Sequence, residues 1–160
     1  MTQQSSMRTL ASIFVVAVAF NYVWELAQAP LYEGMADFSR MLWHCIAPSL
    51  GDGALVLLIF AVGWAALGRR DWFVRPGIRG YALTLIAGLV IATSVELIAV
   101  YALGRWAYTS RMPIAPGLGV GLAPIAQMLA LPPIIFRVVA ARRLTPRASR
   151  EHSRRVRNSI

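Results

Sequence analysis

The sequence contains no lysine, a single cysteine and two histidines, and only 14% of its 160 residues are charged. The lone Cys45 cannot form an intramolecular disulfide or supply a metal site that needs several thiolates. Two histidines, of which His152 lies near the C-terminus, cannot build a histidine-rich metal site. The sequence motifs of zinc proteases, serine hydrolases, P-loop proteins and dinucleotide-binding proteins do not occur. These absences exclude thiolate-rich and histidine-rich metal sites, and the sequence names no cofactor.

Apolar residues dominate instead, because 58% of the chain is hydrophobic and its mean hydropathy is +0.58. Soluble domains carry about 25% charged residues. A helix of about 20 apolar residues crosses the hydrocarbon core of a bilayer. Such stretches occur at about 9–29, 51–67, 81–103 and 118–140. The sequence therefore predicts an all-α fold, with a transmembrane bundle of four helices over 1–140 and a basic, disordered cytoplasmic tail over 141–160.

The first and last apolar stretches both contain irregular features. Ala27-Gln28-Ala29 imitates the cleavage site of a signal peptide, but Pro30 would directly follow the cut, so an uncleaved helix is the better interpretation. In the last stretch, Pro124 and the pair Pro132-Pro133 each remove a backbone hydrogen bond. We expect this helix to be kinked or split at these prolines.

The basic residues, all of them arginine, are unevenly distributed among the connections. Only Arg40, Arg105 and Arg111 lie in the loops after the first and third stretches, whereas the other thirteen of the sixteen lie at the opposite ends. The positive-inside rule then places both termini in the cytoplasm. Exclusive use of arginine suggests a GC-rich genome, so we predict a multi-pass protein of a bacterial inner membrane whose partner is the lipid bilayer. The basic tail has no interleaved aromatic residues, so nucleic acid is not expected as a partner.

Polar side chains interrupt the first apolar stretch along one helical face. Asn21, Glu25, Gln28 and Tyr32 follow i, i+4, i+7, i+11 spacing. An ionisable group in hydrocarbon costs about 2.5–3.5 kcal/mol, so Glu25 needs a partner or a function. Glu96, in the third stretch, is predicted to lie at the same depth. We interpret the two acids as a catalytic acid and base that face a cavity open to the outer leaflet. The alternative is that they join helices structurally, through polar neighbours of their own.

Further catalytic candidates lie near the predicted outer boundary. His44 is either a general base, a metal ligand with Asp52 and a Glu, or an ordinary surface histidine. Asp52 either takes part in the chemistry or caps the second helix. Arg105 either attracts an anionic headgroup or neutralises Glu96. The side chains that we expect to contact the substrate are those of Asn21, Trp24, Gln28, Tyr32, Arg105, Trp106, Tyr108 and Gln127. The aromatic members either line a pocket or form the interfacial belt.

These features favour a small membrane enzyme that acts on a hydrophobic small molecule, a lipid or an isoprenoid, by acid/base chemistry. Two other classes stay open. A proton- or cation-coupled transporter would need polar groups in the inner half of the bundle, which is almost purely aliphatic, and would need a homo-oligomer to enclose a pathway. A non-catalytic subunit of a larger membrane complex would use the acids only for packing. No residue pattern identifies the substrate.

Overall fold

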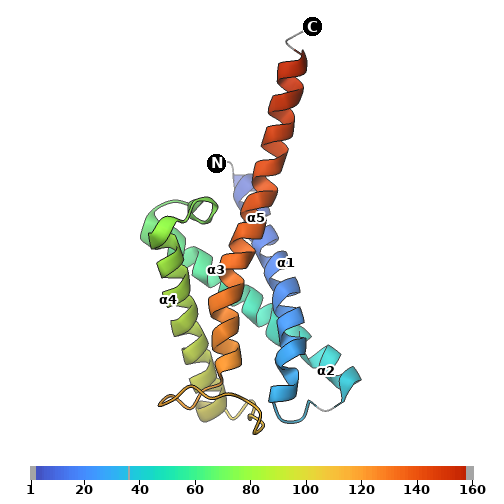
Figure 1. Ribbon diagram of the computed structural model, residues 1–160, viewed down its shortest axis with the longest axis vertical. Coiled ribbons are helices and arrows are strands. Elements are labelled where there is room, and N and C mark those ends of the chain that lie inside the picture. Colours follow the sequence, from blue (N-terminus) through green and yellow to red (C-terminus); the bar gives the residue numbers. More distant parts are fainter. Residues whose placement is uncertain (1–2, 36, 158–160) are drawn as a thin grey trace.

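The structure is a computed structural model that describes residues 3–35 and 37–157. Over these residues the chain is helical and contains no strand. Four helical segments are long and apolar enough to cross a membrane, namely Ser6–Leu31, Phe38–Leu67, Gly77–Ala102 and Leu122–Arg143. The all-α fold class is thereby confirmed, and the four segments are consistent with the predicted multi-pass membrane protein. Helix α1 begins and α5 ends at one end of the bundle, while the loops after α1 and after α4 lie at the other end (Figure 1).

The secondary structure elements begin and end at local sequence signals. They are α1 (Gln3–Gln28), the 3₁₀ turn η1 (Ala29–Leu31), α2 (Phe38–His44), α3 (Ile46–Leu67), the 3₁₀ turn η2 (Trp72–Val74), α4 (Gly77–Glu96), the π-helical segment η3 (Leu97–Ala102) and α5 (Leu122–Arg157). Pro30 ends α1, and the Asp37 side chain caps α2 by accepting from the Arg40 backbone N–H at 2.8 Å. Gly68 ends α3 in the left-handed conformation, with a φ of 67°.

Helix α3 starts earlier than the sequence predicts. It begins at Ile46 instead of Gly51, because Pro48 falls in the first turn, where a helix tolerates proline. Asp52 consequently lies in the second turn and not at the N-terminal cap. The interpretation of Asp52 as the cap of this helix is therefore wrong, and its carboxyl group is free to make tertiary contacts.

Helix α5 also departs from the prediction. It starts at Leu122 because the preceding residues form a tight turn, in which the Ala115 N–H donates to Val120 O at 2.8 Å. Pro124 falls in the first turn, and α5 continues through Pro132 and Pro133 as one helix, so the predicted split is wrong. A kink stays a prediction. Helix α5 extends to Arg157. The predicted division into a bundle over 1–140 and a tail over 141–160 stays a prediction as well. The last residues of that tail lie outside the described part of the chain.

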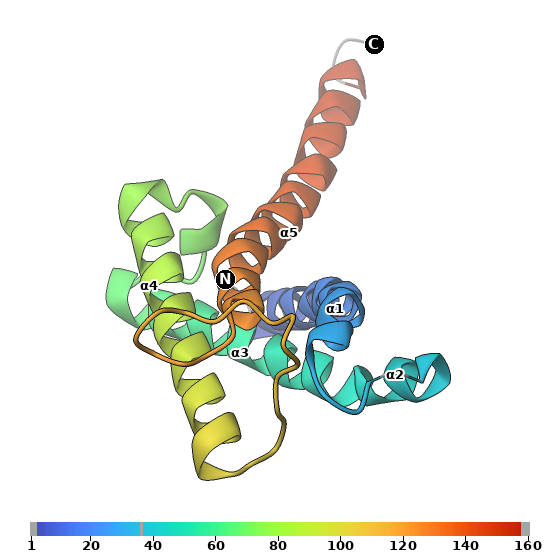
Figure 2. The same cartoon turned by 60° about the horizontal axis from the view of Figure 1, so that its bottom comes forward.

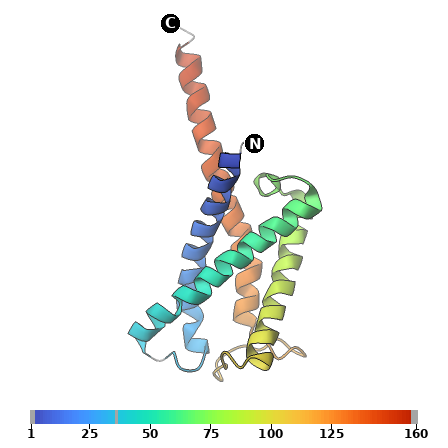
Figure 3. The same ribbon diagram turned by 180° about the vertical axis from the view of Figure 1, so that it is seen from behind.

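Helix α5 forms the centre of the bundle. Half of its membrane segment, 50%, is buried by the protein, compared with 22% to 33% for the other segments. It packs against α1 and α4, while α3 packs obliquely across α1 and α4 on the other side (Figure 3). At the crossing of α4 and α5, Gly88 faces the carbonyl oxygen of Met128 with no room for a side chain. Large apolar side chains cover the outside of the bundle, among them Val15, Ile86 and Val90.

Candidate functional site

Three helices bring polar side chains together at the loop end of the bundle. Glu25 comes from α1, Asp52 from α3 and Gln127 from α5. The Gln127 amide nitrogen donates to Asp52 Oδ2 at 2.8 Å and lies 3.2 Å from Glu25 Oε1. Gln127 is almost fully buried, so these contacts form inside the bundle. One glutamine of the central helix therefore binds both acids.

Other side chains of α1 extend this cluster. Gln28 donates from its amide nitrogen to Glu25 Oε1 at 2.7 Å and to Gln127 Oε1 at 3.1 Å. The Trp24 indole N–H donates to Gln28 Oε1 at 3.1 Å. Asn21 Oδ1 accepts from Gln127 at 2.8 Å, and its own amide donates to Ala17 O. Asn21, Glu25 and Gln28 of the predicted polar face are thus engaged in a hydrogen-bonded network with α3 and α5, whereas Tyr32 lies beyond the helix in extended backbone.

The network contains more acceptors than its amide hydrogens can serve. Three oxygens surround the Gln127 amide nitrogen, those of Asn21, Asp52 and Glu25, but an amide carries only two hydrogens. Glu25 and Asp52 therefore lie close together, since both reach the same amide nitrogen. Two carboxyl groups that share a site shielded from water favour holding one proton between them. We name Glu25 and Asp52 the acid pair.

Glu96 forms a second, adjacent group with the loop of residues 103–121. It ends the α-helical part of α4 and is buried. The Tyr108 hydroxyl and the Trp106 indole N–H both donate to Glu96 Oε2, the latter at 3.4 Å. Tyr108 Oη also accepts from the Gly121 N–H at 3.0 Å. Burial raises the pKa of Tyr108, and its hydrogen bond to Glu96 raises it further, so the phenol keeps its proton and stays a donor.

Tyr32 packs against the two aromatic residues that bind Glu96. Its ring centroid is 5.7 Å from that of Tyr108 and 6.3 Å from that of Trp106. The backbone there is fixed by hydrogen bonds from Glu33 N to Ala107 O and from Thr109 N to Leu31 O, which fasten the loop to the end of α1. Burial raises the pKa of Tyr32, and the charges of Glu96 and Glu25 raise it further. The loop that holds Glu96 is therefore joined to the end of α1, the helix that carries Glu25.

Two of the predicted site residues lie apart from these contacts. His44 is exposed at the end of α2, where its Nδ1 lies 3.0 Å from Arg40 O. Arg105 is exposed too, and the side chains that bind Glu96 are a phenol and an indole. No three histidine, cysteine or acidic side chains of the described residues are placed to hold a metal ion, so the geometry does not support a metal set of His44, Asp52 and a Glu.

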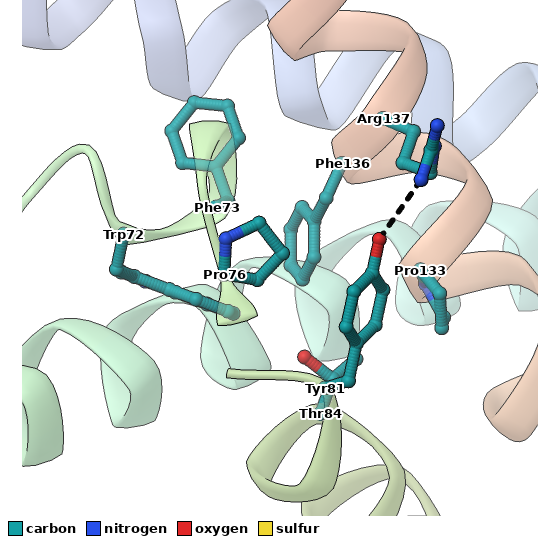
Figure 4. A pocket seen from close by; sticks show the side chains of 8 residues that line it. All are labelled: Trp72, Phe73, Pro76, Tyr81, Thr84, Pro133, Phe136 and Arg137. Atoms are coloured by element: carbon teal, nitrogen blue, oxygen red, sulfur yellow. Dashed lines mark hydrogen bonds between the residues drawn. The ribbon is translucent and has the colours of Figure 1, made fainter. Parts of the chain in front are cut away.

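Two hollows among the described residues are lined by residues other than the acids. The larger, about 330 Å³, lies between α1 and α3 and is lined by Phe14, Val15, Val18, Ala19, Tyr22 and Leu50. The smaller, about 10 Å³, lies at the opposite end of the bundle among aromatic side chains, beside the hydrogen bond from Arg137 Nη1 to Tyr81 Oη at 3.1 Å (Figure 4). It holds at most a water molecule. Every buried side-chain nitrogen or oxygen in the described residues has a hydrogen-bond partner, so the acids lie in a packed network.

Sequence reasoning identified the acids but paired them wrongly. It matched Glu25 with Glu96 by depth, whereas Glu25 and Asp52 reach the same amide nitrogen of Gln127. If Glu96 had only a structural role, Arg105 was the expected partner of its carboxyl group. In the structure, Tyr108 and Trp106 donate to that carboxyl group instead. The sequence did contain a signal that Asp52 lies at a helix contact. Gly53 follows it, and glycine in a membrane helix often permits the close approach of another helix.

In comparisons with protein-family models, with curated proteins and with solved structures, the chain matched none of them. The function must therefore be argued from the site.

Proposed function

We propose that this protein is a small membrane enzyme that acts on a lipid or isoprenoid by acid/base chemistry. The observation that supports it most is that Glu25, Asp52 and Glu96, from three different helices, are each held by neutral hydrogen-bond donors at the same end of the bundle. Placing acids inside a membrane bundle is costly. Packing alone would be served by amides, so the presence of three acids favours chemistry.

The acid pair is the proton donor in this proposal. Glu25 and Asp52 hold a proton between them, and Gln28 and Gln127 fix their orientation. Transfer of this proton to a carbon–carbon double bond of the substrate leaves a cationic centre, and removal of a proton from a neighbouring carbon restores neutrality. Glu96, held by Tyr108, is the base. The product is an isomer of the substrate with one solvent-derived hydrogen, and positioned acid/base groups contribute about 10²–10⁴-fold to such a step.

We further propose that both termini face the cytoplasm of a bacterial cell and that the site faces the outer leaflet. The thirteen arginines at the opposite end of the bundle support this orientation. Tyr32, Trp106 and Tyr108 would then lie at the outer boundary. Their contacts with one another and with Glu96 favour a pocket wall over an interfacial belt.

Deuterium incorporation tests the proposal without a known substrate. Membranes that contain the protein are incubated in D₂O, and the total lipids are compared by mass spectrometry. We expect one lipid or isoprenoid to gain a deuterium with the wild type and with the exposed control Glu33→Gln. Incorporation should fall about 100-fold or more in Glu25→Gln and in Asp52→Asn. Equal deuterium incorporation with the wild type and with the double variant Glu25→Gln, Asp52→Asn would rule out the proposed enzyme.

A non-catalytic membrane subunit is the second candidate. Two observations favour it, namely that all buried polar side-chain atoms of the described residues are satisfied and that neither hollow is lined by the acids. In that case the same substitutions would lower the stability or the assembly of the protein without altering any lipid. Measuring unfolding beside deuterium incorporation separates the two candidates.

A further inference from the structure

The hollow between α1 and α3 has the size and chemistry of a site for a hydrocarbon chain. Its volume of about 330 Å³ lies within the range of ligand pockets, about 300–1,000 Å³. Its lining is hydrocarbon except for the Tyr22 hydroxyl, which donates to Leu42 O at 3.2 Å and is thus engaged elsewhere. All six lining residues belong to membrane-spanning segments, so the hollow opens toward lipid and not toward water.

The hollow lies on the same seam between α1 and α3 as the acid pair. At Gly53, next to Asp52, α3 approaches α1 closely, and a Cβ there would lie 2.8 Å from Val18 Cγ2 and 3.1 Å from Phe14 Cε2. Both of these side chains line the hollow. Val18 and Glu25 are seven residues apart, so they share a face of α1 at a separation of about 10 Å.

A loop lies across the end of the bundle that holds the acids. Residues 103–121 cross the loop end of the bundle (Figure 2). A backbone bridge between Tyr32 and Tyr108 joins this loop to the segment that follows α1. The side chains of Trp106 and Tyr108 join the loop to Glu96. Tyr101 Oη also donates to Gly119 O at 2.8 Å within this loop. Asn21 and Gln127, the innermost members of the network, are fully shielded. Glu25 and Asp52 are half-buried, and the apolar lining of the hollow beside them favours a substrate that arrives from the bilayer.

We infer that the hollow binds the hydrocarbon chain of the substrate, a single chain of a membrane lipid, and thereby directs its reacting group to Glu25 and Asp52. This inference rests on the proposed function, because it names where that enzyme holds its substrate. Gly53 contacts the wall of the hollow and is next to Asp52 in the sequence. This connection to the acid pair distinguishes the hollow from the other lipid-facing surfaces of the bundle.

Photolabelling from within the bilayer tests the inference. The full-length protein is placed in phosphatidylcholine nanodiscs with a trace of phosphatidylcholine that carries a diazirine in mid-chain, irradiated, and mapped by peptide mass spectrometry. We expect residues of the hollow to be labelled about tenfold more than Leu85, Ile86 and Leu89, which are exposed on α4. Equal labelling of the two surfaces would mean that only bulk lipid visits the hollow, and would overturn the inference.

Substitutions that fill the hollow give the matched control. Ala19→Phe, or Val15→Phe as a second variant, should reduce labelling of the hollow to the level of α4, and both positions are exposed enough to accept a larger side chain. Val23→Phe, an exposed position of α1 outside the lining, should leave labelling unchanged. Undiminished labelling in both filled variants would contradict the inference.

The two proposals can fail separately. Glu25→Gln should abolish deuterium incorporation and leave photolabelling intact, because it removes the acid and not the wall. Loss of incorporation with equal labelling of both surfaces would refute the chain site and keep the enzyme. Preferential labelling of the hollow with normal incorporation in the acid variants would refute the acid pair and keep the chain site.

Discussion

At the scale of single residues, the site depends on side chains that donate to acids. Gln127 reaches Glu25, Asp52 and Asn21 from the central helix, and Tyr108 reaches Glu96 from a loop. Hydrogen bonds to charged groups contribute about 1.5–3 kcal/mol, more than those between neutral groups. Much of the local stability at this end of the bundle therefore comes from these contacts.

Removing the Tyr108 hydroxyl tests how much these hydrogen bonds contribute to stability. Tyr108→Phe deletes the donor to Glu96 and the acceptor of the Gly121 N–H, so we expect the free energy of unfolding to fall by about 1.5–3 kcal/mol. Tyr101→Phe, which deletes an exposed hydrogen bond to the same loop, should cost about 1 kcal/mol or less. Reversible unfolding in mixed micelles provides the measurement. A smaller loss for Tyr108→Phe than for Tyr101→Phe would contradict the assignment.

The acids and the amides of the site were predictable at this scale, but their pairing was not. A charged or amide side chain in an apolar stretch is conspicuous because the membrane penalises it, which identified Glu25, Glu96 and Gln127. Pairing depends on how α3 crosses α1, and hence on a helix start displaced by five residues from Gly51 to Ile46. Helix boundaries are the least certain part of a sequence-based prediction because prolines near an end are tolerated.

At the scale of the helices, close crossings position the site. Gly88 lets α4 approach α5 until a Cβ would lie 2.3 Å from the Met128 carbonyl oxygen. Since Gln127 precedes Met128, this crossing also sets the place of Gln127 against α1 and α3. The four membrane segments can be predicted from the apolar stretches of the sequence alone. Which glycine contacts the backbone of a neighbouring helix cannot be predicted, because the spacing of apolar residues does not indicate it.

Gly88→Ala should therefore destabilise the bundle. A backbone carbonyl cannot move aside as a flexible side chain can, so the helices must separate, at a cost of about 1–3 kcal/mol. Gly51→Ala is the control, because nothing lies within 4 Å of a Cβ at that position of α3, and alanine favours a helix. Thermal unfolding in lipid measures both. Equal stability of the two variants would show that the close crossing of α4 and α5 is unimportant.

At the scale of the whole molecule, the proposed orientation assigns the site to the outer face of the membrane. A cysteine-free background is available through Cys45→Ser, because Cys45 is the only cysteine. In intact cells, Arg111→Cys should react with a membrane-impermeant maleimide, whereas Arg75→Cys should react only after permeabilisation. The reverse pattern would place the acids on the cytoplasmic side and contradict the charge argument.

The central claim is that Glu25 and Asp52 hold a proton between them inside the membrane. Infrared spectroscopy of the protein in lipid at neutral pH measures this directly, because a protonated carboxyl group has a C=O stretch that a carboxylate lacks. We predict such a band in the wild type and in Glu33→Gln, a shift of the band in D₂O, and its loss in the double variant Glu25→Gln, Asp52→Asn. A wild-type spectrum without the band, or a band undiminished in the double variant, would contradict the account.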